Sequence, residues 1–169
     1  MIAADRHVVL VGMMGVGKTT VARILGDRLG RQVLDTDAII EQRTGRAVRE
    51  IFATDGEPAF RALESAVLVE VLAAPVPSIV AAAGGIVLEA VNRVALKESG
   101  AKVFWLCAHP TTLVERVRAA GHRPLLDADP AGTLQRMFRD REALYREVAD
   151  AIVLVDNRSV SDVVEAVLR

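Results

Sequence analysis

The stretch Gly12-Met13-Met14-Gly15-Val16-Gly17-Lys18-Thr19 stands between two segments of different periodicity. The run before it, residues 7–11, is rich in valine, and a β-branched run bounded by glycine favours a buried strand. The segment after it, residues 20–29, has apolar residues at helical spacing and predicts an amphipathic helix. A glycine-rich loop that ends in Lys-Thr between a strand and a helix is the arrangement of a P-loop.

The chemistry of this loop explains its residue types. Glycines let backbone N–H groups crowd around phosphate oxygens, and the start of a helix adds unpaired N–H donors. Lys18 is then placed to reach the β- and γ-phosphates of a nucleotide, and the Thr19 hydroxyl to bind Mg²⁺. The alternative is a flexible glycine turn before an ordinary helix. The loop therefore predicts a nucleoside triphosphate site but leaves the reaction open.

Length and composition set the remaining limits. The 169 residues predict one domain, 1–169, and 51% hydrophobic with 25% charged residues is a globular balance. The net charge of −1 gives no reason to expect nucleic acid or an anionic membrane as a partner, and we expect a monomer. A single cysteine, no signal-peptide pattern and no segment of membrane-spanning length together predict a cytoplasmic protein.

Further strands and helices alternate along the chain. This alternation predicts an α/β fold with a parallel sheet covered by helices on both faces. We expect strands at residues 32–37, 78–83, 101–107 and 151–155, and helices at 38–43, 47–53, 57–72, 89–99, 110–119, 131–147 and 160–168. Residues 121–130 lack periodicity, contain two prolines, and suit a surface loop or lid.

Two aspartates end the second predicted strand. Alternation along a strand points Asp35 and Asp37 the same way, at the edge of the sheet where functional groups gather. One carboxylate is then available to the Mg²⁺ shell and the other to a substrate hydroxyl. The alternative is a polar turn in which Asp37 caps the next helix.

Four arginines are candidates for anion binding. Arg123 lies between glycine and proline in the predicted lid, where it is placed to meet the γ-phosphate. Arg61, which has Glu64 three residues later, and Arg141 are open to a plainer interpretation as solvated helix residues. Arg116 either stacks on a purine ring or only decorates its helix.

Six pieces of the chain, in order and at compatible spacings, resemble the shikimate kinase family over essentially the full length. They are Gly12 to Thr19, Leu34-Asp35-Thr36-Asp37, Ile51 to Glu57 with Phe60-Arg61-Ala62-Leu63-Glu64, Ala83-Gly84-Gly85, Arg123-Pro124-Leu125-Leu126, and Arg141-Glu142-Ala143-Leu144-Tyr145. The resemblance implies a three-layer α/β/α fold of the nucleoside-monophosphate-kinase type, with a five-stranded parallel sheet and a mobile lid at about 118–130. It also implies transfer of phosphate from ATP, with Mg²⁺, to the 3-hydroxyl of shikimate.

The resemblance assigns roles residue by residue. Lys18, Asp37 and Arg123 would be catalytic, Thr19 and Asp35 would hold the metal, and Glu64 would orient Arg61. The nucleotide would contact Gly12, Met14, Gly15, Val16, Gly17, Lys18, Thr19, Thr20, Arg116 and Arg123. The substrate would contact Asp37, Phe52, Phe60, Arg61, Gly84, Gly85 and Arg141, with the two arginines on its carboxylate.

The chain departs from the family pattern at three points. Ala83 stands where the family usually has the first of three glycines, Ala81 where it often has Ser or Thr, and Ser159 where it commonly has proline. Two alternatives therefore stay open: a kinase for a related cyclitol or sugar acid, and a catalytically weak nucleotide-binding homologue.

Overall fold

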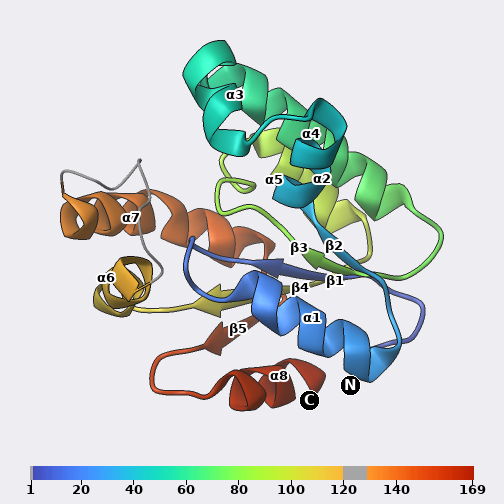
Figure 1. Ribbon diagram of the computed structural model, residues 1–169. Coiled ribbons are helices and arrows are strands. Elements are labelled where there is room, and N and C mark those ends of the chain that lie inside the picture. The colour runs from blue at the N-terminus through green and yellow to red at the C-terminus, as the bar shows by residue number, and fades with distance from the viewer. Residues whose placement is uncertain (1, 120–128) are drawn as a thin grey trace.

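The computed structural model of the chain describes residues 2–119 and 129–169. Its strands are β1 (Val8–Val11), β2 (Val33–Asp35), β3 (Ile79–Ala81), β4 (Lys102–Cys107) and β5 (Ala151–Leu154). They form one sheet in the order β2-β3-β1-β4-β5, and every neighbouring pair is parallel (Figure 1). The predicted five-stranded parallel sheet is confirmed.

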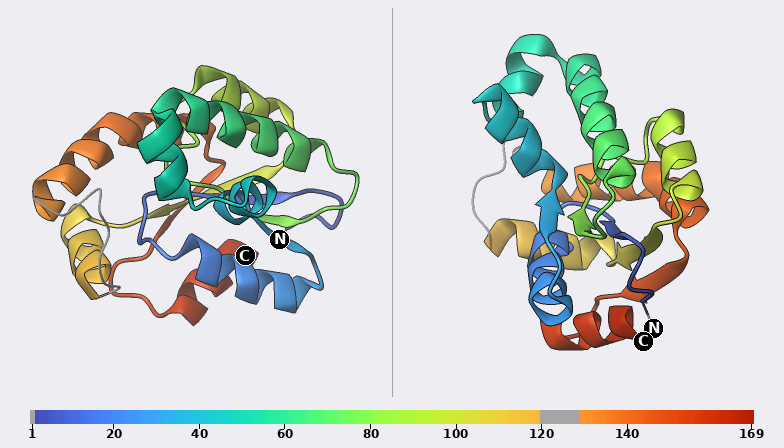
Figure 2. Two further views of the ribbon diagram at one scale, coloured as in Figure 1. Left: turned by 45° about the horizontal axis from the view of Figure 1, so that its top comes forward. Right: turned by 90° about the vertical axis from the view of Figure 1, so that its right-hand side faces the viewer.

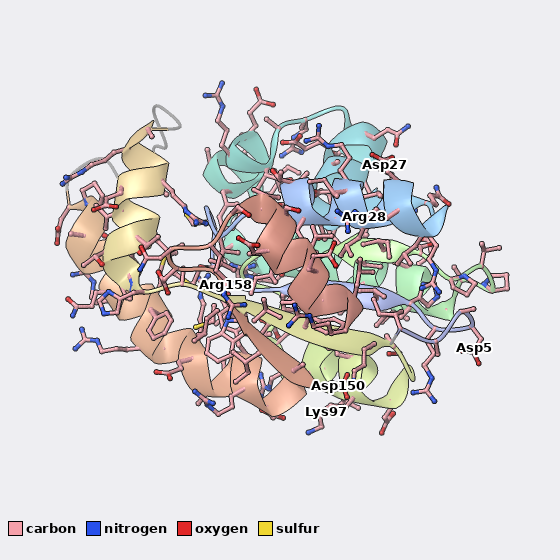
Figure 3. The ribbon with its side chains drawn as sticks, turned by 90° about the horizontal axis from the view of Figure 1, so that it is seen from below. Asp5, Asp27, Arg28, Lys97, Asp150 and Arg158 are labelled. Atoms are coloured by element: carbon pink, nitrogen blue, oxygen red, sulfur yellow. The ribbon has the colours of Figure 1, made fainter. Side chains whose placement is uncertain are left out.

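Helices cover both faces of this sheet. They are α1 (Lys18–Leu29), α2 (Thr36–Thr44), α3 (Val48–Asp55), α4 (Glu57–Ala73), α5 (Ala90–Glu98), α6 (Pro110–Ala119), α7 (Pro130–Val148) and α8 (Val160–Leu168). Helices α1 and α8 lie on one face, whereas α4, α5 and α7 lie on the other (Figures 1 and 2). Figure 3 looks onto the α1 and α8 face, where Arg28 of α1 pairs with Glu165 of α8. The expected three-layer α/β/α architecture is therefore confirmed.

Strand β1 lies at the centre of the sheet, where its apolar side chains are removed from water on both faces. Its four residues are fully buried, and they pair with β3 on one side and with β4 on the other. A strand covered on both faces reads as a continuous apolar run, which is what residues 8–11 show. The loop that follows β1 is thereby held at the carboxyl edge of the sheet.

One predicted boundary is wrong in a way that affects the site. Strand β2 ends at Asp35, and Asp37 lies in the first turn of α2 instead of on the strand. Asp35 is the helix cap, because its Oδ1 accepts the backbone N–H groups of Asp37 and Ala38 at 3.1 and 3.3 Å. The two carboxylates are therefore brought together by a helix cap and not by strand alternation.

The lid expected at 118–130 falls mostly outside the described residues, and so does Arg123. Of that segment the structure describes the end of α6 at Ala119 and the start of α7 at Pro130, with Asp129 as the cap of α7. None of the helices in the described ranges is both long and apolar enough to cross a bilayer.

Candidate active site

The loop between β1 and α1 presents backbone donors at the edge of the sheet. Gly17 caps α1 with φ of 103°, a left-handed conformation that residues with a Cβ rarely adopt. No side chain caps this helix, so the N–H groups of its first turn point toward the loop. Lys18 lies over the same loop, and its ammonium donates to the carbonyls of Gly12 and Met13 at 2.7 and 3.0 Å.

A cavity of about 330 Å³, here called the P-loop cavity, opens in front of this loop. It is lined by Met14, Gly15, Gly17, Lys18, Thr19, Thr20, Asp35, Asp37 and residues 81–84. The Thr19 hydroxyl donates to Asp35 Oδ2 at 2.8 Å, so a hydroxyl and a carboxylate oxygen face each other at its wall. Most of the predicted nucleotide and metal residues thus share one cavity. Gly12 and Val16 belong to the loop but do not line this cavity.

Asp37 has the most perturbed electrostatics in this cavity. Removal from water raises the pKa of Asp37 to about 6, the Asp35 carboxylate acts in the same direction, and the Lys18 ammonium opposes both. Its Oδ1 is buried and accepts no hydrogen bond from any described residue. Asp37 is therefore a carboxylate that binds a proton more tightly than an ordinary aspartate, and one of its oxygens is available to accept a hydrogen bond.

A second cavity of about 290 Å³, here called the arginine cavity, lies between helices α3, α4 and α7. Its lining contains every residue predicted to bind the substrate: Asp37, Phe52, Phe60, Arg61, Gly84, Gly85 and Arg141. Met14, Val48, Glu57, Glu64, Ala83 and Met137 complete it. The cavity therefore combines two guanidinium groups with an apolar wall.

Arg61 is fixed on every side in this cavity. Its Nη1 donates to both oxygens of Glu64 at 2.9 and 3.0 Å, and the Glu64 side chain is fully buried. Its guanidinium carbon lies 5.8 and 5.4 Å from the ring centres of Phe52 and Phe60. A Cβ at Gly85 would overlap the guanidinium where it now lies, so a larger residue there would require Arg61 to shift. Burial raises the pKa of Glu64, and the neighbouring Arg61 opposes this effect.

Arg141 approaches the same cavity from α7. It is buried, and its Nη1 donates to the carbonyl of Gly84 at 3.3 Å. The hydroxyl of Tyr145, one turn later on the helix, donates to the same carbonyl. Tyr145 stacks on Trp105 with ring centres 5.6 Å apart, and its burial raises its pKa to about 12. Helix α7 therefore holds the glycine turn through two donors on one face.

The two cavities meet at a shared wall. Met14, Asp37, Ala83 and Gly84 line both of them. A Cβ at Gly84 would lie 3.3 Å from the backbone nitrogen of Met14, so the glycine turn packs directly on the P-loop. A group bound to the loop and a group bound to the arginines would therefore face each other across Asp37.

Arg116 lies at the other end of the P-loop. Its guanidinium donates to the carbonyls of Val16 and Val155 at 3.1 and 3.4 Å. It therefore ties the loop to the segment between β5 and α8. The predicted contact with adenine stays a prediction.

Sequence reasoning missed several residues of the arginine cavity. Glu57 taken alone gives no reason to place it in a site. Its position four residues before Arg61 on a helix does predict that the two side chains meet. Tyr145 does not line the cavity but donates to the Gly84 carbonyl beside it, and it stands four positions after Arg141, at the same spacing. Val48 and Met137 have no such signal, because apolar helix residues are far more often core than cavity wall.

Known proteins that are similar to this chain include shikimate kinases. The shikimate kinase family model matches residues 14–169. A shikimate kinase of Symbiobacterium thermophilum is 43% identical over 165 residues, which cover 96% of this chain and 94% of that protein. The chain belongs to the shikimate kinase family.

Other members of the family agree in sequence and in structure. A shikimate kinase of Ruegeria pomeroyi is 43% identical over 168 residues, covering 98% of this chain and 85% of that protein. The solved shikimate kinase from Acinetobacter baumannii in complex with shikimate superposes with a TM-score of 0.90 at 35% identity, covering 96% of this chain and 90% of that one. The family and fold predicted from the six sequence pieces are both confirmed.

Proposed function

We propose that this protein transfers the γ-phosphoryl group of ATP to the 3-hydroxyl of shikimate. The observation that carries the proposal is the meeting of the two cavities at Asp37, with a phosphate-binding loop on one side and two guanidinium groups on the other. Family membership supports the same reaction.

The P-loop cavity would hold the polyphosphate. Backbone N–H groups of the loop and the first turn of α1 would donate to phosphate oxygens, and Lys18 would exchange its carbonyl contacts for the β- and γ-phosphates. Arg123 of the predicted lid would add a second cation, and Arg116 would border the adenine.

Thr19 and Asp35 fit a magnesium site. They offer a hydroxyl and a carboxylate oxygen 2.8 Å apart, and Mg²⁺ prefers oxygen ligands. Mg²⁺ usually keeps several waters and relies on phosphate oxygens, which agrees with the lack of any cluster of three or more His, Cys, Asp or Glu in the described ranges. When bound, the ion supplies charge neutralisation at the transferring phosphoryl group.

The arginine cavity would hold the acceptor. Arg61 and Arg141 would bind its carboxylate through paired N–H donors, while Phe52 and Phe60 would pack on the ring. The unused Oδ1 of Asp37 would accept the 3-hydroxyl proton as the hydroxyl oxygen bonds to the γ-phosphorus and the bond to the bridging oxygen of ADP breaks.

A coupled assay that measures ADP release from ATP and Mg²⁺ tests this function directly. We expect turnover with shikimate, and a lower kcat/KM for related cyclitols and sugar acids run in the same panel. Binding of ATP without turnover on any acceptor would contradict the proposal and favour a catalytically weak homologue. A higher kcat/KM for another acid would replace shikimate as the acceptor.

A further inference from the structure

Arg61 has no spare edge in this structure. A guanidinium carries five N–H donors, and the Nε–Nη2 edge is one that can grip a carboxylate with two parallel bonds. That edge is taken by Glu57, whose Oε1 accepts from Nε at 3.2 Å and from Nη2 at 3.0 Å. Nη1 is taken by Glu64. A carboxylate that arrives from solution and grips Arg61 with two parallel bonds must therefore displace one of these two glutamates.

The two glutamates differ in what their release would cost. The Glu64 side chain is fully buried, and a buried charge that loses its partner is strongly destabilising. The Glu57 side chain is 58% exposed and lies at the first position of α4, where water and the positive end of the helix dipole stabilise it without Arg61. Glu57 is therefore the glutamate that an incoming carboxylate would displace from Arg61.

Arg61 is held more firmly than Glu57. Its guanidinium packs against the rings of Phe52 and Phe60, and its Nη1 is bonded to the buried Glu64. We therefore expect exchange at this edge to occur by movement of Glu57 and not by a rotation of the arginine.

The charge balance of the arginine cavity points the same way. Three carboxylates line it with two guanidiniums: Asp37, Glu57, Glu64, Arg61 and Arg141. An anion that enters while Glu57 points inward meets a net negative lining, whereas the lining is balanced once Glu57 turns to water.

We propose that Glu57 competes with the acceptor carboxylate for the Nε–Nη2 edge of Arg61 and thereby sets the affinity and selectivity of the acceptor site. A carboxylate displaces Glu57, because it offers Arg61 the same charge with better geometry than the single oxygen that Glu57 provides. A neutral polyol cannot make this exchange, so the competing glutamate disfavours uncharged acceptors. This inference rests on the proposed function, since it requires an acceptor with a carboxylate.

The variant Glu57→Gln tests the competition, with Glu70→Gln as its matched control. Glu70 lies on the same helix, is exposed, and pairs with Arg43 away from both cavities, so its change removes the same charge. In Glu57→Gln we expect the KM for shikimate to fall about two- to fivefold, the range that an exposed ion pair is worth. The kcat and the KM for ATP should stay within twofold, and Glu70→Gln should change none of these constants.

A carboxamide analogue of shikimate makes the test specific. The fall in KM should be confined to the carboxylate acceptor and should disappear with the carboxamide. Glu57→Ser, which also removes the contact, should reproduce the result if Glu57→Gln unfolds at a lower temperature. A purely structural role for Glu57 would shift the thermal midpoint without this dependence on the charge of the acceptor.

The outcomes separate this inference from the proposed function. If the wild-type protein neither phosphorylates nor binds shikimate, the proposed function and the competition both fail. If the wild type is active but Glu57→Gln leaves the KM for shikimate unchanged, only the competition fails. A rise in that KM would identify Glu57 as a residue that orients Arg61, and it would also overturn the proposal.

Discussion

The hydroxyl of Thr19 donates to Asp35 Oδ2 at 2.8 Å, while Oδ1 of the same carboxylate caps helix α2. One side chain therefore serves the predicted metal site and the fold with different oxygens. Asparagine caps helices as well as aspartate does, so Asp35→Asn separates the two roles.

We expect Asp35→Asn to raise the Mg²⁺ concentration for half-maximal activity about 10- to 100-fold, as loss of a supporting ligand does in metal sites. The thermal midpoint should stay close to that of the wild type. A Mg²⁺ titration at saturating ATP measures the effect, and Asp27→Asn on the exposed side of α1 is the control. An unchanged titration would remove Asp35 from the metal site.

The pH dependence of turnover should report Asp37. Its pKa is raised to about 6 by removal from water and by Asp35, and only the ionised form can accept the hydroxyl proton. We expect kcat/KM for the acceptor to fall about tenfold per pH unit below about 6 and to be flat just above it. A profile that stays level down to pH 5 would contradict a proton-accepting role for Asp37.

Ionisation of Asp37 should lower the stability of the fold, although turnover requires it. A carboxyl whose pKa is higher in the folded than in the unfolded protein binds its proton more tightly when folded, so ionisation destabilises the fold. We therefore expect Asp37→Asn to raise the free energy of unfolding by up to about 3 kcal/mol above pH 6, and by progressively less as pH falls toward about 4. Denaturation curves at several pH values measure this gain, which should accompany a loss of turnover. A gain independent of pH would indicate a packing effect instead.

Gly85→Ala tests whether the packing of Arg61 matters for the acceptor. The added Cβ would overlap the guanidinium, so Arg61 must shift. We expect the KM for shikimate to rise about tenfold or more, with the KM for ATP unchanged as an internal control. In an Arg61→Ala background the same substitution should have little further effect, because coupled residues are not additive. Additive effects of the two changes would show that Gly85 acts independently of Arg61.

Helix α7 offers a matched pair of arginines. Arg141 is buried and faces the arginine cavity, whereas Arg139 is exposed two positions earlier. We expect Arg141→Ala to raise the KM for shikimate by about one to two orders of magnitude, which corresponds to the loss of a charged hydrogen bond. Arg139→Ala should leave it unchanged. Equal effects of the two variants would contradict a carboxylate site on this face.

The fold could be predicted from the sequence because apolar residues are spaced differently in the strands and in the helices. The central strand is a run of buried apolar residues, and the helices around it show apolar residues at helical spacing. The pair of Arg61 and Glu64 was also within reach, because i, i+3 neighbours on a helix meet. These features depend on local spacing alone.

Other features depend on contacts that local spacing does not encode. Asp35 and Asp37 were predicted to share a strand, but the cap at Asp35 starts the helix two residues earlier than the apolar pattern indicates. The bond from Tyr145 to Gly84 joins residues 61 positions apart, and the bond from Arg116 to Val16 joins residues 100 apart. Such contacts follow from the topology of the sheet and become visible only once the strands are ordered.

The peptide at Gly84 has a consequence for enzyme kinetics. Its carbonyl is held by α7, and a Cβ added at it would lie 3.3 Å from the backbone nitrogen of Met14, in the loop that would receive ATP. We therefore expect a shift of either neighbour to move the other through this residue. Occupancy of one substrate site should then alter the dissociation constant at its companion, and thermodynamic reciprocity requires the same factor in both directions.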